Sequence, residues 1–265
     1  MPSAEYKRLL TQAYDIDKPE APADELAFYR RHIGSVATAT GSGNRAPPVL
    51  EVMSGSGRFL VPLLESGVDI DGVDLSADML AACRAKCDER GLDPTLHQQS
   101  LHELDLPRRY GFAFCGGGSF GLIVDTAEAE ESLRRLFDHL LPGGALLIEA
   151  ETPTGPHRSG AWQGRWWRRD DGAVIANRQL NRFDPATRVE TGLGVYELFA
   201  DGVLVETELD EWMCHYWEPD ELRELLEGAG FVDVQVTKAF TSLPLDGEET
   251  SVSLLAVRPE PTHLA

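Results

Sequence analysis

A carboxylate inside an apolar strand marks the most informative segment of this sequence. Glu51 stands within the run Val49–Val52, and burying a carboxylate is costly unless it meets a cation or a hydrogen-bond donor. A ligand that carries an amino group would supply such a partner. The turn that follows has glycine at positions 55 and 57, and the absence of a side chain there lets a ligand approach the backbone.

A second carboxylate, Asp74, ends the next apolar segment. At a strand end it can accept hydrogen bonds from both hydroxyls of a ribose, and a simple strand-end cap is the alternative. A dinucleotide site, and with it an NAD-dependent oxidoreductase, is disfavoured because Leu60 stands where the third glycine is required. A phosphate-binding loop is excluded because Arg58 and Phe59 replace the required Lys-Ser/Thr pair. Together these features indicate an aminoacyl nucleoside.

Alternating strands and helices must position these groups. The periodicity predicts strands at 49–53, 70–74, 95–98, 111–115 and 145–150, with two more after residues 230 and 251, and helices at 57–65, 77–90 and 128–141. Ser76 is the expected N-cap of the second of these helices. Such alternation requires crossover connections, so we expect an α/β, Rossmann-like fold with a mostly parallel seven-stranded sheet and helices on both faces.

Two segments interrupt this alternation. Helices are expected at 3–14 and 24–38, before a linker-like stretch at 38–48, and an antiparallel meander is expected between 166 and 217. The predicted organisation is an N-terminal helical cap (1–44), a core (45–154 and 216–265) and an antiparallel β lid (155–215). Pro219 suits the first turn of one further helix in the core.

Composition limits the partners. A net charge of −20 over 265 residues argues against a nucleic-acid partner, since nucleic-acid binders present a basic face. The four cysteines have no metal-binding spacing, and we expect reduced thiols and no metal site. No apolar run is long enough to span a membrane, and the charged N-terminus lacks the pattern of a signal peptide, so a cytoplasmic protein is expected.

The stretch from Val49 to Ala150 resembles the class I S-adenosylmethionine-dependent methyltransferases. "VLEVMSGSGR" is similar to the first motif of that family and "VDIDGVDLSADML" to its second. The sequence departs from the family pattern at Met53 and Ser54, where glycine and cysteine are common, and at Ser100, where an acid usually binds the adenine amine. The resemblance implies S-adenosylmethionine as cofactor and S-adenosylhomocysteine as product.

The resemblance also implies roles for individual residues. Glu51 would interact with the methionyl amine, and Asp74 would bind the ribose. Leu75 and Met79 would pack on the adenine, and Tyr14 and Tyr29 would close over the cofactor. Core packing is the alternative for Met79 and for the two tyrosines. The full set of expected cofactor-binding residues is Tyr14, Tyr29, Glu51, Ser54, Gly55, Ser56, Gly57, Asp74, Leu75, Met79, Gln99, Ser100, Leu101, Cys115 and Gly116.

The methyl acceptor is expected to be a small molecule that offers nitrogen or oxygen. The segment "FCGGGSFGLI" lacks the Asn/Asp-Pro-Pro-Tyr/Phe motif of methyltransferases that act on adenine or protein glutamine. A strand-rich insertion after the fifth strand resembles the lid of small-molecule N-methyltransferases acting on glycine or on nucleotide-linked amino sugars. The expected substrate-binding residues are Ser119, Phe120, Trp162, Arg165, Trp166 and Trp167.

The arginines and tryptophans of "HRSGAWQGRWWRR" suit an anionic, flat or glycosylated acceptor. A solvated edge strand and a subunit contact, as in a homodimer, are the alternatives. Methyl transfer is an in-line displacement that depends mainly on alignment and exclusion of water. An amine acceptor needs only to arrive unprotonated, whereas a hydroxyl acceptor would want a base, for which His215, His157 and Tyr216 are the candidates. For His215 a structural role is the alternative.

A different class of function stays open at this point. The departures at Met53, Ser54 and Ser100 are also compatible with a protein that binds S-adenosylmethionine without catalysing its reaction. The presence or absence of a cavity for an acceptor, beside the expected cofactor site, discriminates between the two hypotheses.

Overall fold

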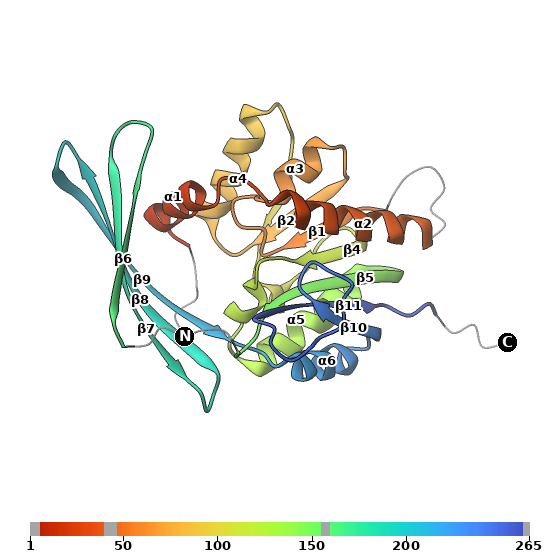
Figure 1. Cartoon of the computed structure of the whole chain (residues 1–265). Coiled ribbons are helices and arrows are strands. Elements are labelled where there is room, and N and C mark those ends of the chain that lie inside the picture. Colours follow the sequence, from red (N-terminus) through yellow and green to blue (C-terminus); the bar gives the residue numbers. More distant parts are fainter. Residues whose placement is uncertain (1–5, 40–46, 155–159, 262–265) are drawn as a thin grey trace.

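A seven-stranded, mostly parallel sheet forms the centre of the molecule (Figure 1). The computed structural model describes residues 6–39, 47–154 and 160–261. The strand order is β10-β11-β5-β4-β1-β2-β3, and β11 runs in the opposite direction to the other six strands. The strands are β1 (Val49–Val52), β2 (Ile70–Asp74), β3 (Thr95–Gln98), β4 (Tyr110–Cys115), β5 (Leu140–Glu151), β10 (Val232–Lys238) and β11 (Ser251–Val257). The predicted fold class is confirmed.

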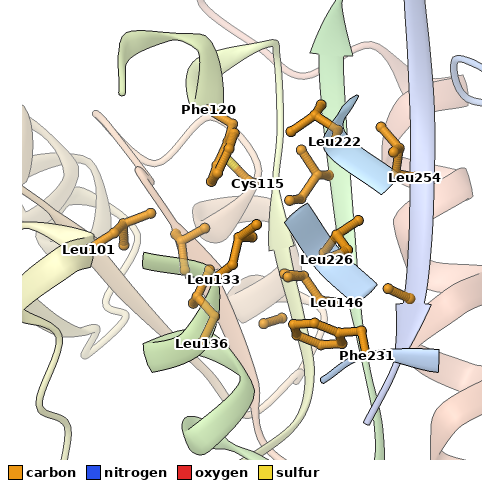
Figure 2. Close-up of a cluster of buried hydrophobic side chains, with 14 of the residues drawn as sticks. Leu101, Cys115, Phe120, Leu133, Leu136, Leu146, Leu222, Leu226, Phe231 and Leu254 are labelled. Atoms are coloured by element: carbon orange, nitrogen blue, oxygen red, sulfur yellow. The ribbon is translucent and has the colours of Figure 1, made fainter. Parts of the chain in front are cut away.

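Helices cover both faces of this sheet because the strand residues that point to each face are apolar. Leu50 and Val52 of β1 join a cluster with α5 (Thr126–His139) and α6 (Pro219–Gly228), part of which is drawn in Figure 2. Val49, one residue earlier, joins the opposite cluster with α2 (Ala23–Ala39), α3 (Leu60–Glu65) and α4 (Ala77–Glu89). None of the helices in the described part of the chain is long and apolar enough to cross a membrane.

Local sequence signals fix several helix boundaries. Ser76 caps α4, since its hydroxyl accepts a hydrogen bond from the Met79 N–H at 3.1 Å, as predicted. Asp125 caps α5 in the same way, and Pro219 occupies the first turn of α6. The helix expected at 57–65 begins instead at Leu60, because the backbone is left-handed at Gly57 (φ 81°) and the turn continues through Phe59.

A separate four-stranded antiparallel sheet stands to one side of the core (Figure 1), in the order β6-β7-β8-β9. Its strands are β6 (Trp162–Arg168), β7 (Val174–Asp184), β8 (Val189–Ala200) and β9 (Val203–His215). Asp201 and Gly202 join β8 to β9 with φ angles of 51° and 77°, the left-handed pair that a two-residue hairpin turn requires. We refer to this sheet as the lid.

The first helix, α1 (Arg8–Asp17), lies between the lid and the core (Figure 1). It begins later than the helix expected at 3–14, of which residues 3–5 lie outside the described part of the chain. The start is set by the lid, because the backbone N–H groups of Leu9 and Leu10 donate to the Glu208 carboxylate of β9 at 3.0 and 3.1 Å. Residues 40–46 of the expected linker also lie outside the described residues.

Candidate active site

A cavity of about 430 Å³ opens at the carboxyl ends of β1, β2 and β4. In open α/β sheets ligands bind at this edge, where neighbouring connections leave the sheet in opposite directions. Twelve of the residues expected from sequence line this cavity: Tyr14, Glu51, Ser54, Gly55, Asp74, Leu75, Met79, Gln99, Ser100, Leu101, Gly116 and Ser119. The tertiary structure therefore brings together residues from five separate parts of the chain.

Glu51 is buried in β1 and faces this cavity. Its Oε2 atom has no hydrogen-bond partner among the described residues. Burial raises the pKa of the Glu51 carboxyl well above its ordinary value, while the Leu60 backbone N–H and the Arg58 guanidinium act in the opposite direction. A buried acceptor without a donor is costly, so a ligand that donates a hydrogen bond here would stabilise the folded protein.

The glycine loop after β1 is shaped by its contacts with β2 and α4. The Gly55 N–H donates to the Asp74 carboxylate at 2.8 Å. At Gly57 an added Cβ would lie 2.5 Å from the Cys83 sulfur atom, and the backbone is left-handed. Gly57 therefore keeps the loop packed on α4 without itself lining the cavity. Met53, in the first non-strand position, also has a positive φ of 53°, the conformation that glycine adopts most easily.

Asp74 holds two backbone groups while it lines the cavity. Its Oδ2 accepts from Gly55 and its Oδ1 from the Ser76 N–H, both at 2.8 Å. Burial raises the pKa of the Asp74 carboxyl, and these backbone donors oppose that effect. Because each carboxylate oxygen has a second lone pair, Asp74 retains acceptor capacity for ligand hydroxyls.

The opposite wall of the cavity consists of the segment after β3. Ser100, Leu101 and His102 line it, and the Ser100 hydroxyl donates to the Glu103 carboxylate at 3.1 Å. The Gln99 amide is engaged by its own loop, through bonds of 3.1 and 2.8 Å with the Asp105 backbone. Ser100 therefore offers a ligand a hydroxyl in place of the carboxylate that the family pattern expects.

A second cavity, of about 390 Å³, lies between the inner face of the lid, α1 and the core. The two cavities have six wall residues in common: Tyr6, Tyr14, Lys18, Gly117, Ser119 and Leu122. The Tyr6 and Tyr14 rings meet edge to face, with centroids 5.9 Å apart. The first cavity is therefore directly adjoined by space for a second ligand.

The aromatic and basic cluster of β6 is divided between two faces. Arg165 and Trp167 line the second cavity, where both are bound to Asp17 of α1 at 3.1 Å. Trp162 and Trp166 are 54% and 65% exposed and lie on the outer face, since successive strand residues point to opposite sides. Trp162 and Trp166 therefore line neither cavity, and their role in acceptor binding stays a prediction.

The three candidates for a base differ in their position relative to the cavities. His215 lines neither cavity; it is buried against Trp217, with ring centroids 3.9 Å apart, and burial lowers its pKa. Tyr216 lines the second cavity, but its hydroxyl donates to Glu190 at 2.7 Å, and burial followed by that bond raises its pKa. His157 lies outside the described residues.

Five other expected residues lie beside the first cavity rather than in its wall. Tyr29 is fully buried between Phe59 and Phe114, and an added Cβ on Gly116 would lie 2.9 Å from its hydroxyl. Ser56 is bonded to Lys86 at 3.1 Å. The remaining three, Gly57, Cys115 and Phe120, are also absent from the cavity wall because they pack into the core or the loop.

Sequence reasoning missed most of the second cavity. Its wall includes Glu151, Asn177, Gln179, Tyr196, Asp210 and Trp212, none of which stood out by motif. Strand alternation in β7, β8 and β9 was the available signal, but it does not say which face turns toward the core. Tyr6, Lys18, Arg58, Asp125 and Glu128 of the first cavity were missed as well.

Comparisons with known proteins agree with this geometry. Residues 49–144 match the family model described as "Methyltransferase domain". A curated relative, the dTDP-3-amino-3,6-dideoxy-alpha-D-glucopyranose N,N-dimethyltransferase of Streptomyces fradiae, is 31% identical over 155 residues. That match covers 56% of this chain and about half, 55%, of the relative.

Solved structures match over nearly the whole chain. An S-adenosylmethionine-dependent methyltransferase from Clostridium acetobutylicum gives a TM-score of 0.76 at 14% identity, covering 94% of this chain and 97% of that one. The sugar N-methyltransferase KedS8 from Streptoalloteichus gives 0.73 at 22% identity, covering 94% and 92%. At these identities the likeness establishes the fold alone.

Proposed function

We propose that this chain, which carries a methyltransferase domain in the class I S-adenosylmethionine-dependent fold, transfers a methyl group from S-adenosylmethionine to a nitrogen atom of a sugar-like small molecule. The observation that carries this proposal is the pair of adjoining cavities. One is walled by Glu51, the glycine loop and Asp74, and the other lies beneath the lid. A protein that only binds the cofactor has no need of the second.

The residues of the first cavity fit the proposed cofactor. Glu51 Oε2, which has no partner among the described residues, would accept from the methionyl amine. Asp74 would accept from the ribose hydroxyls, and Leu75 and Met79 would pack against the adenine. The bound cofactor supplies an electrophilic methyl group on a sulfonium.

The chain's own contribution is alignment and exclusion of water. Tyr6, Tyr14 and Leu122, at the junction of the cavities, enclose the space in which the two ligands meet. The acceptor nitrogen would use its lone pair to take this methyl group, and the electron pair of the C–S bond would remain on sulfur. The proton released from the methylated nitrogen leaves to water.

Two observations favour nitrogen over oxygen as the acceptor. Of the bases expected from sequence, His215 does not line the second cavity and the Tyr216 hydroxyl is held by Glu190, so neither is placed to take a proton from a hydroxyl. An unprotonated amine needs no base. The Streptomyces fradiae relative is named for an amino sugar carried by a nucleotide, and we extend that acceptor class to this chain.

The outer face of the lid supports a homodimer as the assembly. Trp162 and Trp166 on the edge strand β6 are 54% and 65% exposed on that face, and large aromatic side chains are enriched at protein interfaces. A net charge of −20 opposes self-association over the rest of the surface and disfavours nucleic acid. Light scattering on the wild type and on Trp166→Lys tests this assembly, and a monomeric wild type contradicts it.

The function is tested first by calorimetry with S-adenosylhomocysteine. We expect binding in the micromolar range for the wild type, and no binding at high micromolar concentration would refute the cofactor assignment. Mass spectrometry then follows methyl transfer from S-adenosylmethionine to dTDP-3-amino-3,6-dideoxy-α-D-glucopyranose, the compound for which the relative is named. Binding without transfer to any amine of this class would favour the non-catalytic alternative.

A further inference from the structure

The inner face of the lid carries a buried polar cluster that the proposed reaction does not yet use. It consists of Asn177 on β7, Tyr196 on β8 and Asp210 on β9, all in the wall of the second cavity. Asn177 is paired with Tyr196 across the sheet, and Asp210 with Gly194. These three residues are defined here as the lid cluster.

The three side chains lie close together around Gly194 on the inner face of the lid. An added Cβ at Gly194 would lie 3.2 Å from the Tyr196 ring, 3.7 Å from Asn177 Nδ2 and 3.7 Å from Asp210 Cβ. Asn177 and Asp210 are therefore neighbours in the wall of the second cavity. A single ligand in that cavity can contact both side chains.

The cluster is buried yet incompletely satisfied. Asn177 and Asp210 are only 6% and 7% exposed. Asn177 Nδ2 has no hydrogen-bond partner among the described residues, and no side-chain bond or ion pair of Asp210 occurs within them. Buried donors and acceptors of folded proteins are normally paired, and an unpaired one costs stability. Both groups are thus available to a ligand.

The surroundings of Asp210 favour a group that donates N–H. Tyr6 and Lys7 approach it from the N-terminal segment, Tyr196 from β8, and Glu208 and Glu211 flank it on its own strand. Burial, and secondarily Glu208, raises the pKa of Asp210 to about 6, against the influence of Lys7. At pH 7.5 the carboxylate is ionised, and a protonated or neutral amine satisfies it by donating N–H.

We infer that Asp210 and Asn177 form the subsite that recognises the acceptor, with Asp210 accepting from its amino group and Asn177 donating to an adjacent hydroxyl oxygen. This inference rests on the proposed function and identifies the part of the acceptor that the lid recognises. The ligand chemistry is a vicinal amino alcohol, as on an amino sugar. Both a nucleotide-linked amino sugar and an amino sugar without a nucleotide carry such a group.

The test is calorimetry on protein saturated with S-adenosylhomocysteine. One arm uses dTDP-3-amino-3,6-dideoxy-α-D-glucopyranose and its counterpart with a hydroxyl in place of the amine. The second arm uses the matching pair of methyl glycosides, which lack the nucleotide. We expect the amino form to bind at least tenfold more tightly than the hydroxyl form in one arm, and that arm identifies the source of the sugar.

Asp210→Asn should weaken binding of the amino probe by about tenfold, as expected for loss of a charged hydrogen bond. Affinities for the hydroxyl probe and for S-adenosylhomocysteine should stay within about twofold of wild type. Glu211→Gln, the same charge change on the outer face of β9, is the matched control and should change none of the three. Asn177→Ala should weaken both sugar probes while preserving their ratio.

A measurement on the wild type keeps the inference testable if the variants fold poorly. Affinity for the amino probe should fall about tenfold between pH 7.5 and pH 5, because protonation removes the Asp210 charge. Any of three results would overturn the inference. They are equal affinity for the amino and hydroxyl forms, failure to bind either amino probe, and an affinity of Asp210→Asn for the amino probe equal to that of the wild type. Those results leave binding of S-adenosylhomocysteine intact, whereas loss of that binding in the wild type refutes the proposed function instead.

Discussion

The backbone N–H of Gly55 donates a 2.8 Å hydrogen bond to the Asp74 carboxylate, so a single side chain joins the glycine loop after β1 to the end of β2. The same carboxylate accepts from Ser76, at the start of α4. Two segments that sequence analysis treats as separate motifs are therefore one mechanical unit. Any ligand that contacts Asp74 also contacts the residue that fixes the loop.

Asp74→Asn tests this unit. An amide has one acceptor oxygen, so it cannot accept from both Gly55 and Ser76, and its NH₂ group faces a backbone donor. We expect a loss of about 1–2 kcal/mol in the free energy of unfolding and at least about tenfold weaker binding of S-adenosylhomocysteine. Asp78→Asn, at an exposed position in the first turn of α4, is the control for urea unfolding and calorimetry and should alter neither quantity appreciably.

Gly57→Ala separates steric conflict from backbone strain. The new Cβ would lie 2.5 Å from the Cys83 sulfur and 2.9 Å from Val61, at a position with positive φ. Gly67 also has positive φ, but no atom lies within 4 Å of its added Cβ. We expect Gly57→Ala to destabilise the protein by roughly 1–3 kcal/mol more than Gly67→Ala. Equal thermal and urea stability of the two variants would contradict this account of the loop.

Glu149 should make stability fall as pH rises. It is buried in β5 and bonded to Ser253 at 2.8 Å, and burial raises the pKa of its carboxyl to about 8 from the ordinary 4.5. Between these values the native state binds more protons than the unfolded state, so the contribution of Glu149 is complete below pH 4.5 and is lost up to about pH 8. Between pH 5 and pH 8, Glu149→Gln should flatten the slope of unfolding free energy against pH by about 1 kcal/mol per pH unit. If urea titrations show the same slope against pH for Glu149→Gln and the wild type, Glu149 is not the source of the pH dependence.

His215→Phe should leave the pH dependence of kcat unchanged. The imidazole is buried against Trp217 and lines neither cavity, so it has no contact with the proposed reacting atoms. Steady-state kinetics from pH 6 to pH 9 provide the measurement. A loss of kcat by about a hundredfold, the size expected for a general base, would show that the sequence-based candidate was right.

Glu208→Ala probes the attachment of α1 to the lid. The carboxylate accepts from the Leu9 and Leu10 N–H groups at 3.0 and 3.1 Å, and loss of such a cap costs about 1 kcal/mol. Since α1 carries Tyr14 between the two cavities, we also expect weaker binding of S-adenosylhomocysteine. Glu211→Ala on the same strand is the control. Full retention of stability and affinity in Glu208→Ala would mean that α1 is held elsewhere.

Short-range sequence signals were enough to predict the sheet, the N-cap of α4 and twelve of the residues that line the first cavity. Local periodicity identifies β1 and β2, and Ser76 marks the start of α4. Once parallel strands are identified, their carboxyl ends must meet at one edge, which places Glu51, Gly55 and Asp74 together without further information. The identity of the fold follows from the same short-range signals.

The residues of the second cavity follow from long-range packing rather than from local sequence patterns. Alternation in β7, β8 and β9 assigns residues to two faces, but docking of the lid against α1 selects the face with Asn177, Tyr196 and Asp210. The same applies to His215, which sequence places near an active site and packing directs onto Trp217. The physical reason is that periodicity reports the pairing of neighbours within an element, whereas the partner of an entire face depends on contacts between residues nearly 200 positions apart, such as Leu9 and Glu208.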